Sequence, residues 1–308
     1  MRRFAFGILG LLGIAFAAAP ASAVSVPGCG DFIIFAKDDI VFESGLTLLF
    51  GDIFVQSPTG QVKVGANNIL HGTVSAHKIV VGTNAVVDEC VADIIEGPGT
   101  CTVKTIGFTP AAACTASFPP SPLVVPVFPA VCSPGTVVNI PDNTPGATLA
   151  PGCYNNLRIG KGSVLTLTPG GTYFFKGAEA RLLKGATLIS GTGQPSAKAT
   201  VNVQGILISE TEITLNNLNV NVLSNSGQAV QISLNSLLQD TVISAPFGNN
   251  HPHGGTQLRG DTELIAKTFH DIEPITNERP PINDICVCPS GFHFPVPGVT
   301  PDRICVPN

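Results

Sequence analysis

The sequence lacks tryptophan, has one methionine and two tyrosines, and only 12% of its 308 residues are charged. With 44% hydrophobic residues, the chain is too apolar for an intrinsically disordered protein, so we expect it to fold. Its 16 basic and 21 acidic residues form no basic run that could neutralise a phosphate backbone. We therefore expect no nucleic-acid partner. Helical periodicity is nearly absent beyond the N-terminal segment, which indicates a mostly β fold.

The N-terminal segment has the features of a secretory signal peptide. Arg2 and Arg3 precede an apolar stretch over 4–19, and Ala-Ser-Ala at 21–23 is a small-x-small cleavage pattern. The stretch is shorter than the roughly 20 residues that a membrane span needs. We therefore expect residues 1–23 to be removed, with no membrane span afterwards. We expect a secreted protein in the extracellular space or the periplasm. This expectation includes retention at the cell surface.

All nine cysteines lie beyond position 23, in a chain whose expected compartment allows disulfides. Short loops favour pairing of Cys90 with Cys101, and of Cys286 or Cys288 with Cys305. At least one cysteine remains unpaired within the chain, and the connectivity stays open. The disulfide candidates are Cys90, Cys101, Cys114, Cys132, Cys153, Cys286, Cys288 and Cys305.

Short apolar or alternating runs, bounded by glycine, asparagine and proline, predict many strands of three to six residues. Clear examples are Lys78–Val81, Leu157–Ile159, Val164–Leu167, Thr172–Phe175 and Ile206–Ser209. Strands this short suit a parallel solenoid, where each coil stacks on the next, better than a meander of long hairpins.

An internal similarity supports a repeat. Ser-Pro-Thr-Gly at 57–60 corresponds to Ala-Pro-Phe-Gly at 245–248, and the later glycines Gly72 and Gly260 follow the two prolines at the same interval. Coils such as Gly-Gly-Thr-Tyr-Phe-Phe at 170–175 lie between the copies.

These motifs, with Ala-His-Lys-Ile at 76–79 and Ala-Lys at 266–267, resemble secreted bacterial right-handed β-helix surface proteins, including adhesin-like and ice-binding-like ones. The run 62–87 also resembles bactofilin-type polymer-forming proteins, which are cytoplasmic, whereas this chain has an export signal. The resemblance covers residues 50–90 and 148–272. It implies a parallel β-helix and a role at a surface.

The predicted fold is all-β: a right-handed parallel β-helix with a Pro/Cys-rich insertion and a Cys-rich C-terminal tail. We expect a signal peptide at 1–23, N-terminal coils at 24–90, the insertion or linker at 91–147, the main β-helix at 148–272 and a disulfide-stapled tail at 273–308. The proline density of 91–147 argues against central strands there.

Candidate catalytic groups are sparse. The pairs Asp38-Asp39 and Asp88-Glu89 consist of strand neighbours, whose side chains point to opposite faces. Tyr154 and Tyr173 are the only tyrosines that could stack on sugars. We assign no catalytic residue and no cofactor. The scarcity of these groups argues against an enzyme.

Other motifs favour structural roles. His251, His253 and His270 are weak candidates for a metal site, against the alternative of a polar turn. Arg-Gly-Asp at 259–261 matches the integrin tripeptide, but the repeat explains its glycine. Six asparagines between 216 and 235 could form amide ladders between coils. Regular Thr-x-Thr arrays are nearly absent, which argues against ice binding.

The sequence therefore predicts a structural or adhesive protein of the bacterial surface or extracellular matrix that presents a rigid β-helix. The expected partners are extracellular polysaccharide or surface proteins, with self-association through open coil ends as a further class. The alternatives are a polysaccharide-active β-helix enzyme and a carbohydrate-binding module.

Overall fold

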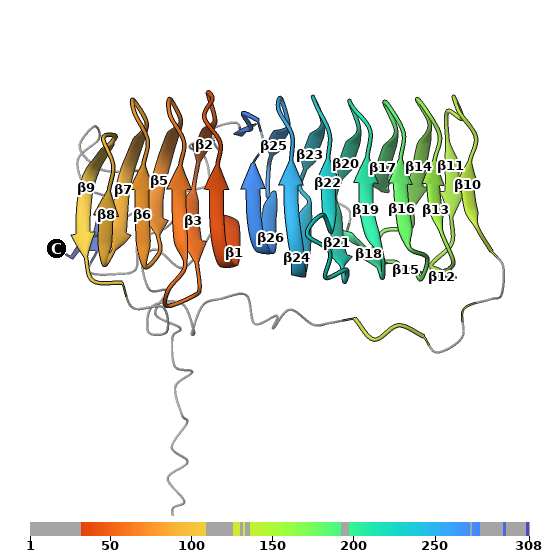
Figure 1. Cartoon of the computed structure of the whole chain (residues 1–308). Helices are drawn as coiled ribbons and strands as arrows, with labels where there is room; N and C mark the ends of the chain where they lie inside the picture. The colour runs from red at the N-terminus through yellow and green to blue at the C-terminus, as the bar shows by residue number, and fades with distance from the viewer. Residues whose placement is uncertain are drawn as a thin grey trace, which may run out of the picture.

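The computed structural model describes residues 32–108, 126–129, 132, 136–191, 197–271 and 273–277, and two short strands at 292–293 and 306–307. The described residues contain no helix. Twenty-seven strands form one continuous parallel hydrogen-bonded sheet that winds into a solenoid (Figure 1). The prediction of an all-β parallel β-helix is confirmed.

The solenoid has three faces, which we call sheets 1, 2 and 3. Six strands bend around a corner and contribute to two sheets. Sheet 1 contains, in spatial order, β8 (Ile94–Glu96), β6 (Lys78–Val81), β4 (Gln61–Val64), β1 (Phe32–Phe42), β26 (Glu263–Asp271), β24 (Val242–Pro252), β22 (Val230–Ile232), β19 (Ile206–Ser209), β16 (Glu179–Leu182), β13 (Leu157–Ile159) and β10 (Val138–Ile140).

Sheet 2 contains β9 (Thr100–Ile106), β7 (Val86–Ala92), β5 (Ile69–Ser75), β2 (Leu48–Phe50), β27 (Thr276–Asn277), β25 (Gln257–Arg259), β23 (Leu237–Gln239), β20 (Thr214–Asn216), β17 (Thr187–Ser190), β14 (Val164–Leu167) and β11 (Ala147–Leu149). Sheet 3 contains β9, β7, β5, β3 (Asp52–Val55), β1, β26, β24, β21 (Leu218–Val222), β18 (Ala199–Val203), β15 (Thr172–Phe175) and β12 (Gly152–Tyr154). The strands β28 (Phe292–His293) and β29 (Val306–Pro307) pair antiparallel with each other.

The order of the coils in space differs from their order in the chain. β1 lies in the middle of the solenoid and the chain winds outward from it to β9 at one end; we call this part, residues 32–108, the N-terminal stack (Figure 1). The C-terminal stack, residues 136–277, starts with β10 at the opposite end and winds back until β26 pairs with β1. The two stacks therefore meet at an internal seam.

The core is a set of ladders, one side chain from each coil, because alternate residues of a strand point inward. One inward ladder of sheet 1 is apolar at every position except Asn250. It contains Val138, Leu157, Ala180, Leu207, Val230, Asn250, Phe269, Ile40, Val62, Ile79 and Ile95.

Eight of the turns from sheet 1 to sheet 2 each use one residue with a left-handed backbone. Glycine and asparagine adopt this conformation most easily, and all but one of the eight residues are of these types. They are Asn67, Asn84, Asn143, Gly162, Gly185, Glu212, Asn235 and Gly255, with φ between 56° and 70°. The repeated glycines Gly72 and Gly260 also have positive φ, and both lie at the corner between sheets 2 and 3. This gives the glycine of the Arg-Gly-Asp tripeptide a structural role.

The coils extend further than their predicted boundaries. Strands β8, β9 and β10 and the start of β11 lie within 91–147, so the segment without a described strand narrows to the part between Ile106 and Val138. The prolines Pro141, Pro145 and Pro151 lie beside edge strands β10, β11 and β12, where the described residues pair on one side only.

The predicted disulfide between Cys90 and Cys101 is confirmed, and it joins β7 to β9 at one end of the solenoid. A second disulfide joins Cys132 to Cys153 on β12, at the opposite end. The expected pairing of Cys286 or Cys288 with Cys305 lies outside the described residues, as does Cys114. Two disulfides are typical of an oxidising compartment.

Candidate binding surface

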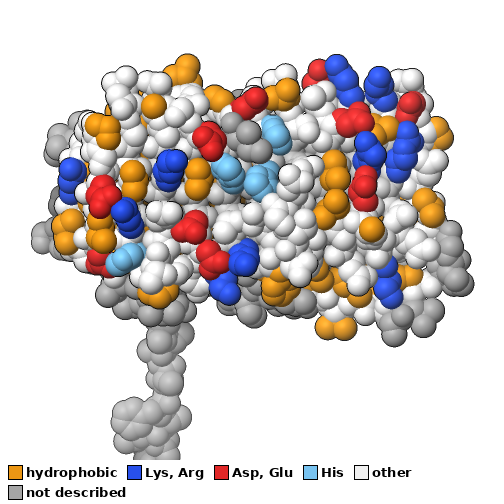
Figure 2. All heavy atoms as spheres, viewed as in Figure 1, with side chains coloured by type: hydrophobic (Ala, Val, Ile, Leu, Met, Phe, Trp, Pro, Cys, Tyr) orange, Lys and Arg blue, Asp and Glu red, His pale blue; other side chains and the backbone are white. Residues whose placement is uncertain are grey.

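Sheet 1 has a charged outer surface, which we call the charged face. Figure 2 shows Lys, Arg, Asp, Glu and His side chains spread across it. Several of these charges are paired with each other: Lys78 Nζ lies 2.8 Å from Glu96 Oε2, and Arg181 lies within 3.8 Å of Glu179 and of Glu210. The outward charged residues on or beside its strands include Asp39, Glu43, Lys63, Lys78, Glu96, Arg158, Glu179, Arg181 and Glu210.

The histidines of the charged face have protein partners. His251 Nε2 lies 2.7 Å from the Gly227 carbonyl oxygen, and His270 Nε2 lies 2.9 Å from Glu43 Oε1. The rings of His251 and His270 are 5.5 Å apart, and burial lowers the pKa of His251. Within the described part of the chain, no three His, Cys, Asp or Glu side chains are placed to hold a metal ion. Among the described residues, the candidates His251, His253 and His270 therefore do not belong to a cluster that could hold a metal ion.

Sheet 3 is covered, and we call it the covered face. Its outward-facing side chains Phe35, Phe54, Asn202 and Ser244 are at most 5% exposed. Described parts of the connection between the two stacks lie against it. Phe108, at the end of the N-terminal stack, packs on Phe54 of β3 near the middle of this face, with ring centroids 5.9 Å apart.

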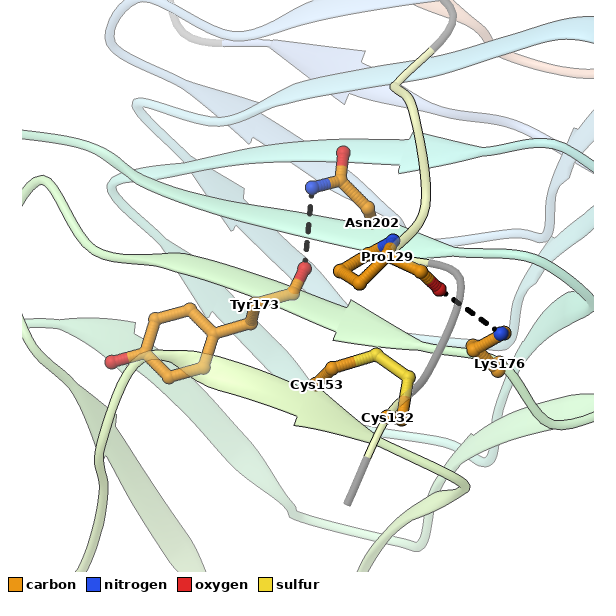
Figure 3. The surroundings of a disulfide bond; sticks show 6 residues. All are labelled: Pro129, Cys132, Cys153, Tyr173, Lys176 and Asn202. Atoms are coloured by element: carbon orange, nitrogen blue, oxygen red, sulfur yellow. Dashed lines mark hydrogen bonds between the residues drawn. A yellow bond between two sulfur atoms is a disulfide. The ribbon is translucent and has the colours of Figure 1, made fainter. Parts of the chain in front are cut away.

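At the β12 end of the covered face, the connection is attached by three contacts, two of which are drawn in Figure 3. Cys132 forms its disulfide with Cys153, and Lys176 Nζ donates a hydrogen bond of 3.1 Å to the Pro129 carbonyl oxygen. The Phe128 ring packs edge-on against Phe174, with centroids 5.3 Å apart. Described residues of the chain itself therefore occupy the covered face at β3 and at its β12 end.

Sheet 2 presents two outward rows of exposed or half-buried side chains, and we call this surface the neutral face. The first row contains Val164, Thr187, Thr214, Leu237, Gln257, Thr276, Leu48, Ile69, Val86 and Thr100. The second contains Thr148, Thr166, Ile189, Asn216, Gln239 and Arg259 from one stack, and Phe50, His71 and Asp88 from the other.

Charge is rare among the described outward side chains of the neutral face. Only Arg259 and Asp88 are charged residues, and both have polar neighbours: Arg259 donates to Gln257 Oε1 at 3.1 Å, and Asp88 lies 3.1 Å from His71 Nδ1. Parallel strands lie about 4.8 Å apart, so the eleven strands give a surface about 48 Å long. It offers hydroxyl, amide and aliphatic groups in a repeated arrangement.

The neutral face is also firmly supported. The rings of Phe50 and His71 stack with centroids 4.7 Å apart. The Asn277 side chain accepts a hydrogen bond from the Phe50 amide and donates one to the Phe50 carbonyl oxygen, both at 2.7 Å. This amide pair holds the neutral face together where the two stacks meet.

The carboxylates of Asp88 and Glu89 point to different faces and do not form an acid–base site. Asp88 faces sheet 2 and contacts His71, whereas Glu89 faces sheet 3 and accepts a hydrogen bond from Thr73. Both tyrosines have partners within the chain: the buried Tyr173 hydroxyl donates to the Leu149 carbonyl oxygen, and the hydroxyl of half-buried Tyr154 donates to that of Ala150 while its ring stacks on Phe175. Neither tyrosine is an outward platform for a sugar ring.

Searches found no matching family model, no matching curated protein and no matching solved structure. In the part of the chain that the structure describes, no helix has the length and apolar character of a membrane span.

Sequence reasoning did not locate the neutral face. Its neighbours Thr187, Thr214 and Leu237 are more than 20 positions apart in the chain, and each strand contributes only one or two side chains to it. The available signal was the identity of the outward residue in each strand. These outward residues can be assigned to one surface only when the register of the coils is known.

Proposed function

We propose that this chain is a secreted, non-catalytic structural or adhesive protein that binds an uncharged extracellular polysaccharide along its neutral face. The observation that carries the proposal is the scarcity of charge along this surface, while the other two faces are charged or covered by the chain. Export is supported by the N-terminal signal pattern and by the two disulfides.

The chemistry of the neutral face suits a neutral polymer. Binding an uncharged polysaccharide here desolvates few ions, and the threonine hydroxyls and the Gln239 and Gln257 amides offer donors and acceptors for sugar hydroxyls. The strands are held in a continuous hydrogen-bonded stack, so little conformational entropy is lost on binding. Repetition along the rod allows many weak contacts to act together.

The two ends of the solenoid support lateral binding over end-to-end assembly. On β9, Lys104 is in register with buried Cys90, so a charged side chain takes a core position at the edge. At the opposite end, Pro141, Pro145 and Pro151 flank the edge strands. Inward charges and prolines discourage the pairing of strand edges.

The test is a matched pair of variants assayed with insoluble microcrystalline cellulose and chitin, and with charged alginate. Gln239→Lys places a cation on the neutral face, and Gln231→Lys makes the same change on neighbouring β22 of the charged face. We expect Gln239→Lys to weaken binding to the neutral polymers about tenfold or more, because the cation must be desolvated. Gln231→Lys should bind like the unmodified chain.

Three outcomes would overturn the proposal. They are no binding to either neutral polymer, equal effects of the two substitutions, and binding to alginate alone. Release of reducing ends from soluble polysaccharides would instead support the enzyme alternative. Inhibition of ice growth without polysaccharide binding would indicate that the ligand of the neutral face is ice and not a polysaccharide.

A further inference from the structure

The seam between the two stacks is built from residues about 227 positions apart in the chain. β1 and β26 are in register from Ile34 and Leu264 to Phe42 and Asp271, with one irregularity. The Glu43 amide donates to the Asp271 carbonyl oxygen, and the Leu48 amide donates to that of Ile275. No disulfide among the described residues crosses this joint.

A buried carboxyl group lies at the centre of the seam. Asp271 is 0% exposed and faces the coil interior beside the corner that joins sheets 1 and 2. Its Oδ2 accepts a hydrogen bond of 2.9 Å from Thr47 Oγ1 of the other stack, and its Oδ1 accepts one from the Glu273 amide. Thr47 Oγ1 in turn accepts a hydrogen bond from the Ile275 amide.

The charges near Asp271 do not compensate a buried carboxylate. Glu43 and Glu273 are close enough to oppose its ionisation. The cationic or titratable side chains nearby lie on the outer surface of sheet 1: His270 on β26, His251 on β24, Lys63 on β4, and His253 directly after β24. Burial first, and then these two carboxylates, raise the pKa of Asp271 to about 7, against the lowering effect of its two hydrogen bonds. Thr47 can serve either protonation state because a hydroxyl both donates and accepts.

The direction of the pH effect follows from linkage. When the seam opens, Asp271 meets water and regains its ordinary pKa of 3.8. Between 3.8 and about 7, the closed seam keeps a proton that the open seam releases. Closure is therefore most favourable in acid, and this advantage is lost as the pH rises towards 7.

We propose that the seam is a pH-sensitive joint, in which a proton on buried Asp271 keeps the two coil stacks closed and its loss near neutrality loosens β1 against β26. The coils remote from the joint stay ordered. A rod of this kind is stiff in acidic surroundings and acquires a hinge at its middle in neutral or alkaline ones.

The experiment is hydrogen–deuterium exchange of the oxidised full chain at about pH 5 and about pH 8, corrected for the intrinsic rate. Segments from β1, β2 and β26 report on the seam, and segments from β16 and β19 report on a remote part of the same solenoid. We expect opening at the seam to increase by roughly tenfold to a hundredfold at the higher pH, as the release of one proton allows. The remote segments should change far less.

Three variants separate the causes. Asp271→Asn should remove most of the pH dependence at the seam, because an amide does not titrate, whereas His270→Gln should retain most of it. Glu96→Gln on remote β8 removes an exposed carboxylate and should behave like the unmodified chain. Equal changes at seam and remote segments of the unmodified chain would overturn the proposal even if Asp271→Asn failed to fold. Retention of the full pH dependence in a folded Asp271→Asn variant would also overturn it.

Discussion

Glu212 is the exception among the eight left-handed residues at turns from sheet 1 to sheet 2. It has φ 64°, whereas the equivalent residue in the next coil is Asn235 with φ 56°. A Cβ-bearing residue without a local hydrogen-bonding side chain is strained in this conformation. We expect Glu212→Asn to raise the free energy of unfolding by about 0.5–1 kcal/mol. Urea denaturation measures the change.

Two controls separate strain from charge at this turn. Glu212 pairs with Lys184 at 3.0 Å, but both side chains are about half exposed, so the pair contributes little. Lys184→Gln should therefore change stability by less than about 0.5 kcal/mol. Asn235→Glu should introduce the strain and lower stability. If Glu212→Asn and Lys184→Gln had equal effects, the ion pair would be the relevant feature and the backbone would not be.

Asn250 is a second residue that conflicts with its surroundings. It is fully buried in an otherwise apolar ladder, and neither its Oδ1 nor its Nδ2 has a hydrogen-bond partner. An unsatisfied buried amide costs about 1–3 kcal/mol, and Val230 in the same ladder shows that valine fits. We expect Asn250→Val to raise the unfolding free energy by about 1–3 kcal/mol in thermal or denaturant unfolding.

Asn202 provides the matched control. It is equally buried, but it donates to the Tyr173 carbonyl oxygen and accepts a hydrogen bond from Asn221. Asn202→Val should therefore lower stability by about 1 kcal/mol. If Asn250→Val also lowered stability, the Asn250 amide would have a partner in the core, such as an ordered water.

At the scale of single elements, the sequence was most informative where polar or glycine turns delimit an apolar run. The structure has β6, β13, β14, β15 and β19 with the predicted bounds. β16 was missed because Glu179 and Arg181 occupy its outward positions and leave only Ala180 and Leu182 as inward residues. No bond of the expected amide ladder joins two of the six predicted asparagines among the described residues: Asn221 bonds instead to Asn202 of the neighbouring coil, and Asn217 and Asn235 form left-handed turns.

At the scale of the molecule, the internal similarity was read correctly as a repeat but did not reveal the order of the coils. The copies at 57–60 and 245–248 lie near the seam, in the neighbourhood of β1 and β26. Local patterns predict strands but contain no information on which distant strand completes a pairing. The neutral face and the buried environment of Asp271 both depend on that long-range pairing, so neither could be predicted from the sequence.

The ends of the rod determine whether the protein stays monomeric, and a substitution of Lys104 tests this directly. It occupies an inward position on edge strand β9, where an apolar residue would present a flat strand edge to a second copy. We expect the unmodified chain to sediment as a monomer over a wide concentration range. Lys104→Val should add end-to-end association, because coil ends that share one strand direction can pair head to tail into filaments.

Lys63→Val is the matched control, since it removes the same charge from the side of the rod on β4. It should remain monomeric in sedimentation and in negative-stain images. Filaments of the unmodified chain would show that Lys104 does not protect the end, and would return self-association to the proposed function. Association of both variants alike would indicate a general loss of solubility. A difference between the two variants would locate the barrier to polymerisation at the open edge of β9.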